Sequence, residues 1–484
     1  MRSLPPRVTS PSHWLLGPAY HARRRPLEWI STWIAEYGEI YTIRSIFGQA
    51  TIVAAPEMVR RVLIDNYPKY QEKSLAYNVL RILMGNGLVT SQGEVWRTRR
   101  KLVQPAFHRR RLDGLFTMMV ERVTECARQL DSVSATGKAV NLAPLLSRLT
   151  LDIIARAMFS SDVQGSAADV SRHIAILNEY ALRMLRQPWL FLLPRRFPTP
   201  FSATQFRSLT ALNAIVHGII KARRAQPEAH DDLLSMLLSA CEEDTGRGMS
   251  DEQLRDEVMT IFVAGHETTA NAMCWLLYLV SQHPAVEEEL LTEIETHWPE
   301  GGLSTANIGT FSYVRQVIEE SLRVYPTIWS VGRRCTEEDE LGGYRIPMGM
   351  NIVIPIFHFH RSKQFWTEPE KFDPARFSPE RRPPADSLFY FPFGAGPRSC
   401  IGNQFALQEL MIMTIIFYRH YHFEVESGFA VEADPLITLR PKNGMVMTMR
   451  RRVSLGFTGK TRRDIGINPS IDFASNGEDS CKRL

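Results

Sequence analysis

A cysteine in a glycine-rich stretch is the residue of this sequence best suited to chemistry. Cys400 precedes residues 401–420, where apolar side chains recur at helical spacing. A cysteine at the start of a helix lies near unpaired backbone N–H groups, which favour the thiolate over the thiol. Arg398, two residues earlier, is a cation that could pair with an acidic group on a ligand. Three glycines here permit tight turns and the close approach of a flat ligand: Gly394, Gly396 and Gly402.

Four kinds of site come into question for such a cysteine. A structural zinc site needs paired Cys-x-x-Cys ligands, and the sequence has none. A dinucleotide-binding loop requires a third glycine where Ser399 stands. A buried, inert cysteine accounts for neither the glycines nor Arg398. The fourth possibility is a thiolate ligand to heme iron, an arrangement that favours cleavage of the O–O bond.

The spacing of this stretch resembles the heme-binding signature of the cytochrome P450 family. The six constrained positions of that signature are occupied by Phe393, Gly394, Gly396, Arg398, Cys400 and Gly402. The resemblance implies a mainly α-helical fold with a small β lobe, heme b as the cofactor and Cys400 as the iron ligand. It also places Phe393, Arg398 and Gly402 at the cofactor. It covers roughly residues 37–450 and is closer to soluble bacterial members than to membrane-anchored ones.

A long helix is predicted over residues 250–282, beginning with a capping box and ending before Pro284. Its centre contains a glycine and two threonines, a composition that favours a local widening of the helix. A polar patch on a buried helix is the alternative reading of this centre. The resemblance implies instead that Glu267 and Thr268 form the family's acid–alcohol pair, which relays protons to dioxygen. It also places Ala264 at the heme and Val263 at the substrate.

Trp96 and Arg100 lie four residues apart, on one face of a predicted helix. Read alone, this basic segment is a helix face exposed to solvent. By resemblance, the pair contacts one heme propionate, and Arg333 is a candidate for the second, because a guanidinium binds carboxylates in bidentate fashion. Other basic residues nearby are expected to face an acidic electron-transfer protein: Arg97, Arg99, Lys101 and residues 109–111.

Glu320 and Arg323 lie three residues apart in a predicted helix over residues 312–324. Read alone, such a pair is a surface salt bridge of little energetic value. By resemblance it is a buried pair that binds Arg376 further along the chain, and these three residues maintain the fold. His358 and His360 are predicted to share a strand face, which permits a metal pair but is more typical of core or surface histidines.

The substrate is expected to contact residues from four parts of the chain. Residues 67–90 look irregular, and in the family this region covers the distal side of the heme. The resemblance assigns six residues to the substrate: Tyr77, Leu80, Val263, Ile328, Trp329 and Ile437. Residues 187–199 hold an apolar run between two prolines, which could cap a substrate channel, touch a membrane surface or pack in the core.

Composition limits the class of protein. The chain has 484 residues, of which 44% are hydrophobic and 23% charged, an ordinary globular balance. A net charge of +5 does not indicate nucleic-acid binding. Six cysteines without paired spacing favour a reducing compartment, and a cytoplasmic protein is expected. Residues 1–25 resemble neither a signal peptide nor a membrane span, so no membrane anchor is expected.

Three segments are predicted: an N-terminal extension (1–36), a cytochrome P450 domain (37–455) and a polar, poorly ordered tail (456–484). The resemblance implies a monooxygenase that inserts one atom of dioxygen into a lipophilic small molecule, such as a terpenoid or a fatty acid. Its electrons would come from a separate ferredoxin- or flavodoxin-type donor, because the chain has no evident flavin or nicotinamide domain. The alternatives are a peroxide-driven peroxygenase or isomerase, and a non-catalytic heme-binding protein.

Overall fold

The computed structural model describes most of the chain up to residue 452. The described residues are 3–10, 17–45, 48–72, 77–159, 169–170, 172–174, 176–177, 179–180, 200–225, 232–241, 246 and 248–452. The predicted apolar segment 187–199 and the predicted tail 456–484 lie outside them. The described residues up to Arg451 form one compact unit.

Helices make up most of the described chain, as the sequence predicted. Those before residue 240 are α1 (Ala19–Arg24), α2 (Pro26–Tyr37), α3 (Pro56–Arg60), α4 (Tyr77–Met84), α5 (Gly93–Val103), α6 (Arg109–Ser134), α7 (Ala143–Phe159), α9 (Pro200–Ala225) and α10 (Leu233–Ser239). The others are α11 (Asp251–Ser281), α12 (Pro284–His297), α13 (Ser312–Val324), α14 (Ile356–Phe359) and α15 (Asn403–His420). Shorter turns of π- or 3-10 helix are η1 (Arg61–Asp65), η2 (Tyr67–Tyr70), η3 (Gln104–Phe107), η7 (Ile308–Thr310), η8 (Pro374–Phe377) and η9 (Gly396–Arg398).

The helix α11 is the central element of the helical part. It has 31 residues, which at about 1.5 Å per residue give a length of about 46 Å. Ser250 and Gln253 form the predicted capping box: the Ser250 hydroxyl accepts the Gln253 N–H, and the Gln253 side chain accepts the Ser250 N–H. The helix is continuous through its glycine- and threonine-containing centre.

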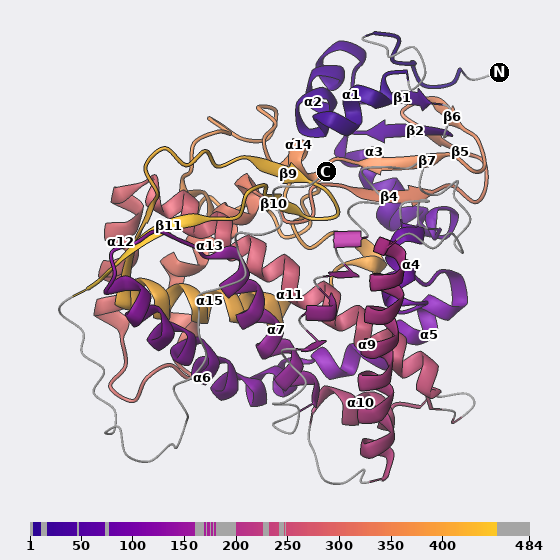
Figure 1. The fold of residues 1–484 in the computed structure, drawn as a ribbon. Coiled ribbons are helices and arrows are strands. Elements are labelled where there is room, and N and C mark those ends of the chain that lie inside the picture. Colours follow the sequence, from indigo (N-terminus) through magenta and orange to yellow (C-terminus); the bar gives the residue numbers. More distant parts are fainter. Residues whose placement is uncertain are drawn as a thin grey trace. The chain divides into compact units, whose positions relative to one another are not determined.

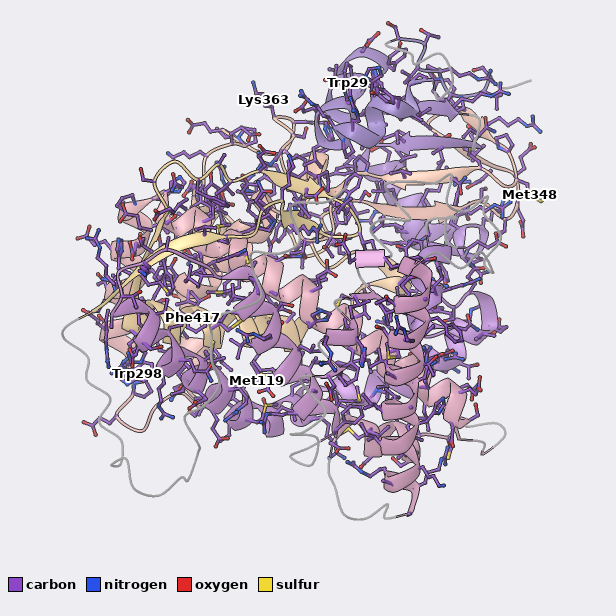
Figure 2. The ribbon with its side chains drawn as sticks, viewed as in Figure 1. Trp29, Met119, Trp298, Met348, Lys363 and Phe417 are labelled. Carbon is purple, nitrogen blue, oxygen red and sulfur yellow. The ribbon has the colours of Figure 1, made fainter. Side chains whose placement is uncertain are left out.

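A single large apolar core holds the helical part together. The helix α11 packs against α7, α9, α13 and α15, and α15 also packs against α6 (Figure 1). Met119 of α6 and Phe417 of α15 are both buried in this core (Figure 2). The segments that bracket the cysteine loop and the acid–alcohol pair are therefore held in one close-packed body, which positions them accurately.

The small β lobe lies beside α1 and α2 (Figure 1). Its sheet has the order β1-β2-β7-β4. The strands of this sheet are β1 (Ile40–Ser45), β2 (Gly48–Val53), β7 (Asn351–Ile354) and β4 (Val331–Arg334). Polar and apolar residues alternate over residues 40–54, which predicts a hairpin. This hairpin is confirmed, because β1 pairs antiparallel with β2, and β2 then pairs parallel with β7. Trp29 of α2 (Figure 2) and Trp33 belong to an apolar cluster that covers this sheet, and the centres of their rings lie 5.4 Å apart.

Three small sheets complete the fold. One contains β3 (Val140–Asn141), β11 (Val446–Arg451) and β8 (Tyr421–Val425). The second pairs β5 (Asp339–Leu341) with β6 (Tyr344–Ile346), and the third pairs β9 (Ala433–Pro435) with β10 (Leu439–Pro441). The sequence predicts paired strands over residues 342–357. The strands β6 and β7 of this stretch do not pair with each other, since each belongs to a different sheet.

Two further local predictions are wrong. The segment predicted as irregular contains α4 over residues 77–84, because its apolar side chains lie on one face of a short helix. His358 lies in the short helix α14 and His360 directly follows it, so they do not share a strand face. The Nε2 atom of His360 accepts the Phe391 N–H at 3.1 Å, and burial lowers the pKa of His360 to about 3. His360 is thus a neutral core residue.

No helix among the described residues is both long enough and apolar enough to cross a membrane.

Candidate active site

The loop before Cys400 depends on two glycines with positive φ angles. Gly394 has φ +73° and Gly396 has φ +70°, conformations that side chains other than glycine adopt at a cost. A Cβ atom at Gly396 would lie 2.0 Å from the Leu63 carbonyl oxygen, so the loop lies directly against η1. The Cys400 N–H donates to the Phe393 carbonyl at 2.8 Å, which closes the loop.

The sulfur of Cys400 is presented at the end of this loop. The helix α15 begins at Asn403, two residues later than predicted, with Gly402 as its N-cap. Cys400 is exposed, although its surroundings are protein and burial raises the pKa of its thiol. The Gly402 N–H and the charge of Arg100 act in the opposite direction and lower that pKa. An exposed sulfur in a protein interior, with one backbone N–H bonded to it and a cation nearby, is well placed to bind a metal as a thiolate.

Arg398 is held rigidly but keeps part of its guanidinium free. Its Nη2 atom donates to the Gln71 and Ser91 carbonyls at 3.2 and 3.0 Å. Its guanidinium carbon lies 4.4 Å from the centre of the Trp96 ring, a cation–π contact. The Nε and Nη1 atoms are buried and have no hydrogen-bond partner among the described residues. Burial lowers the pKa of Arg398 to about 10.

Arg333 on β4 is a second buried guanidinium with an unused donor. Its Nη1 atom donates to the Gly332 carbonyl at 2.9 Å, while Nε has no partner among the described residues. Burial lowers the pKa of Arg333, and Arg398 is near enough for the charge of Arg333 to help lower the pKa of Arg398. Buried donors of this kind require an anion. Two neighbouring guanidiniums fit the two propionates of heme, so the residues present suit this cofactor.

Arg100 makes its hydrogen bonds to the cysteine loop and to its own helix segment, unlike Arg398 and Arg333. Its Nη1 atom donates to the Ser399 carbonyl at 2.7 Å, and its Nε atom donates to Gln104 at 3.3 Å. Its charge also lowers the pKa of the Cys400 thiol. Arg100 therefore supports the cysteine loop directly, whether or not it also reaches a propionate.

On α11, Ala264 is exposed although its neighbour Val263 is only 7% exposed. The Thr268 hydroxyl donates to the Ala264 carbonyl at 2.8 Å, one turn earlier in the helix. A Cβ atom at Gly265 would lie 3.2 Å from Ile154 of α7, so this glycine permits close packing of the two helices. The helix thus presents a small residue and a hydroxyl on its exposed surface, where a ligand can approach.

Glu267 lies on a different face of α11 and contacts the C-terminal part of the chain. Its Oε1 atom accepts the Thr438 hydroxyl at 2.7 Å, and the Asn271 Nδ2 atom donates to the same hydroxyl at 3.2 Å. The contacts of Thr438 and Asn271 with this carboxyl group were not predicted. The signals in the sequence were that Thr438 follows Ile437, a predicted substrate residue, and that Asn271 lies one turn after Glu267.

The six predicted substrate residues come from several elements. Leu80 on α4 and Val263 on α11 belong to the helical core, while Ile328 packs on the core under the sheet. Trp329 donates its Nε1 hydrogen to the Leu436 carbonyl at 2.9 Å, which brings it beside the turn that carries Ile437. Tyr77, at the first position of α4, influences the pKa of both Arg333 and Arg398, so it lies near the guanidiniums.

Glu320, Arg323 and Arg376 are brought together in the interior. The Nε atom of Arg323 lies 2.7 Å from one oxygen of Glu320, and the Nε atom of Arg376 lies 3.4 Å from the other. Both Glu320 and Arg323 have side chains that are 0% exposed. Arg323 also donates to the carbonyls of His360, Pro369 and Lys371. These bonds tie α13 to the segment before the cysteine loop.

The predicted basic surface is wrong at one position. Arg99 is buried, and its Nη1 atom lies 2.7 Å from Glu257 of α11, so it cannot face a partner protein. Arg97 is exposed and pairs with Glu94 on the same helix. Lys101 is also exposed. Within the described residues, no group of histidine, cysteine and acidic side chains is arranged to bind a metal ion.

Comparison with known proteins identifies the family. A sequence model of cytochrome P450 matches residues 6–448. A putative cytochrome P450 132 of Mycobacterium tuberculosis is 32% identical over 417 residues, covering 83% of this chain and 87% of the relative. Cyclooctat-9-en-7-ol 5-monooxygenase of Streptomyces melanosporofaciens is 32% identical over 404 residues, covering 83% and 86%. The crystal structure of the cytochrome P450DA heme domain superimposes with a TM-score of 0.82 at 25% identity, covering 93% of this chain and 98% of that one.

The family match spans the cysteine loop, α11 and the buried guanidiniums alike. The fold of the described residues is likewise that of a known heme domain. The chain therefore belongs to the cytochrome P450 family and is a heme-binding monooxygenase of that family.

Proposed function

We propose that this monooxygenase inserts one atom of dioxygen into a lipophilic small molecule, with terpenoids as the favoured class. The predicted substrate residues Leu80, Val263, Ile328 and Ile437 are all apolar, which suits a hydrophobic ligand. The similar Streptomyces enzyme is named for its action on cyclooctat-9-en-7-ol, an unsaturated alcohol. A separate ferredoxin- or flavodoxin-type protein supplies the electrons.

Named residues would hold the cofactor. Cys400 would bind the iron through its sulfur, and the unused donors of Arg398 and Arg333 would bind the two propionates. Ala264, on the exposed surface of α11, and Phe393, in the cysteine loop, would contact the cofactor. Trp96 would hold Arg398 in place through its ring. Gly402 would leave its N–H free to bond the sulfur.

The bound heme supplies the iron at which dioxygen is bound and split. The chain itself contributes residues of α11 that can transfer protons. The position of the Thr268 hydroxyl is the observation that carries the proposal. Thr268 presents a hydroxyl beside exposed Ala264, where it can accept a proton and pass it on. Glu267, the next residue, has a carboxyl group that can take up a proton and pass it to this hydroxyl. A peroxygenase or an isomerase has no use for such a pair.

A ligand screen tests the substrate class. Purified holoenzyme is titrated with farnesol, lauric acid and, as a hydrophilic control, glucose, while the heme absorption band is recorded. Displacement of water from the iron shifts this band, and we expect the larger shift with farnesol and none with glucose. Absence of a shift with both lipophilic compounds would contradict the proposal.

Thr268→Ala tests the proton role. With a supplied ferredoxin and its reductase, we expect product per electron consumed to fall at least about twofold, with more peroxide released, because the hydroxyl that passes the proton is gone. The heme spectrum should stay native. An unchanged yield of product per electron would rule out the role of Thr268.

A further inference from the structure

Hydrogen bonds on both sides of Thr438 fix the turn between β9 and β10 to neighbouring segments. The Trp329 Nε1 hydrogen is donated to the Leu436 carbonyl at 2.9 Å. The Leu439 N–H is donated to the Thr327 carbonyl at 2.8 Å, and the Leu439 carbonyl accepts the Trp275 Nε1 hydrogen at 2.9 Å. Thr438, in this turn, is only 4% exposed. Its hydroxyl is therefore held at a fixed position relative to α11.

The hydrogen-bond directions at Thr438 follow from the groups involved. The single hydroxyl proton of Thr438 is donated to the Glu267 Oε1 atom at 2.7 Å. The hydroxyl oxygen can then only accept, and it accepts from the Asn271 amide at 3.2 Å. The order of donation is thus Asn271 to Thr438 to Glu267. A buried donor committed in this way fixes the orientation of the carboxylate it serves.

Glu267 and Asn271 lie four residues apart and therefore share one face of α11. Thr268 lies about 100° further round the helix, on the surface where Ala264 is exposed. Without an external partner, the long Glu267 side chain could turn to several positions relative to the Thr268 hydroxyl. Thr438 supplies that partner from a segment 171 residues away in sequence.

We propose that Thr438, supported by Asn271, is a positioning residue that holds the Glu267 carboxylate in the orientation from which it supplies protons. This proposal rests on the proton role of Glu267 proposed above. Ile437 is the neighbour of Thr438 and a proposed substrate contact, so the same turn joins substrate binding to proton supply. Loss of the Thr438 hydroxyl then diverts electrons from productive turnover to peroxide.

The test compares variants of the full-length holoenzyme. Thr438→Val removes the hydroxyl and keeps the shape, whereas Thr438→Ser keeps the hydroxyl. Peroxide released per NADH consumed is measured with a ferredoxin and its reductase, first without substrate and then with farnesol. We expect Thr438→Val to raise this ratio at least about twofold, and Thr438→Ser to restore the native ratio. Thr414→Val is the matched control, since its buried hydroxyl donates to Leu410 within α15.

A double-mutant cycle shows whether Thr438 acts through Glu267. In a Glu267→Gln background, Thr438→Val should raise the peroxide ratio no further than Glu267→Gln does alone. A further increase would overturn the proposal, because Thr438 would then act by another route. The solvent deuterium isotope effect on NADH oxidation should change in both single variants, a signature that simple loosening of the turn would not produce.

The remaining outcomes separate the two proposals. If Glu267→Gln raises the peroxide ratio and Thr438→Val does not, the positioning role is wrong and the proton role of Glu267 stands. If Glu267→Gln leaves the ratio at the native value, both proposals are wrong. The heme spectrum and the spectral change on binding imidazole are recorded for every variant, so that loss of the cofactor is not mistaken for uncoupling.

Discussion

At the scale of single residues, Glu409 on α15 is a carboxyl group in an unusual environment. Its side chain is fully buried, and neither oxygen has a hydrogen-bond partner among the described residues. The Thr269 hydroxyl is nearby but donates to the Gly265 carbonyl. Burial raises the pKa of Glu409 well above its usual value, and Thr269 offsets this only in part. Burial therefore favours the protonated form of Glu409 in the folded protein.

This raised pKa makes stability depend on pH. In the unfolded chain Glu409 ionises above about pH 4.3, while in the folded chain it stays protonated to a higher pH. The stability that Glu409 contributes is complete below its pKa in the unfolded chain. It is lost as pH rises towards its pKa in the folded chain, at about 1.4 kcal/mol of unfolding free energy per pH unit. Glu409→Gln, neutral in both states, should raise the melting temperature relative to the native protein more at pH 8 than at pH 5.

Thermal unfolding at several pH values measures this effect. Exposed Glu300→Gln serves as the control for the loss of one negative charge. A difference in melting temperature between Glu409→Gln and the native protein that stays constant from pH 5 to pH 8 would show that Glu409 is ionised in the folded state.

At the scale of elements, the cysteine loop packs against η1 so closely that there is no room for a side chain at Gly396. Gly396→Ala would place a methyl group 2.0 Å from the Leu63 carbonyl and require a left-handed conformation. We expect it to cost more than about 2 kcal/mol of stability and to release heme. Gly428→Ala is the control, since Gly428 also has a positive φ, +79°, but a Cβ atom there would have no other atom within 4 Å.

The ratio of heme absorbance to protein absorbance, together with urea unfolding, distinguishes the two glycine variants. Equal heme loss in both would mean that the loop does not depend on close approach to η1.

A buried ion pair joins α5 to α11. Arg99 lies 2.7 Å from Glu257, and the second oxygen of Glu257 accepts the Leu88 N–H at 2.9 Å. Burial raises the pKa of Glu257, and Arg99 opposes this. Arg99→Met leaves the buried carboxylate unpaired and should cost about 3–5 kcal/mol of unfolding free energy. The cost should be smaller at pH 5 than at pH 8, because Glu257 without Arg99 takes up a proton more readily.

Denaturant unfolding of matched variants checks this prediction. Arg97→Met removes an exposed pair on the same helix and should cost less than about 1 kcal/mol. Arg99→Met combined with Glu257→Gln should recover much of the loss, since a neutral amide can still accept the Leu88 N–H. A cost for Arg99→Met no greater than that for Arg97→Met would show that the buried pair contributes little.

At the scale of the whole molecule, the folded unit closes with β11. This strand ends at Arg451 and pairs with both β8 and β3, and the family match ends at residue 448. We therefore expect a chain that ends at Leu455 to keep the melting temperature and the carbon monoxide difference spectrum of the full chain. A lower melting temperature or a changed spectrum would show that residues 456–484 belong to the folded unit.

Local sequence was sufficient to predict the elements whose constraints are local. The spacing around Cys400 required glycine at two left-handed positions, and the structure has both there. The capping box at Ser250 marked the start of α11 to the residue. The helical content, the hairpin β1–β2 and the family followed from patterns that lie within a few residues of one another. In these cases the physical cause, a backbone angle or a helix cap, acts at short range.

Tertiary packing decided what depends on distant segments. Arg97 and Arg99 are the same residue type two positions apart, yet only Arg99 is buried, and only Arg99 reaches the buried Glu257 of α11. The bond from Thr438 to Glu267 joins residues 171 positions apart, and no periodicity in the sequence indicates it. The sequence by itself therefore determined the family and the cysteine loop. Which charges are buried, and which groups they contact, was decided by the packing of α11 against its neighbours.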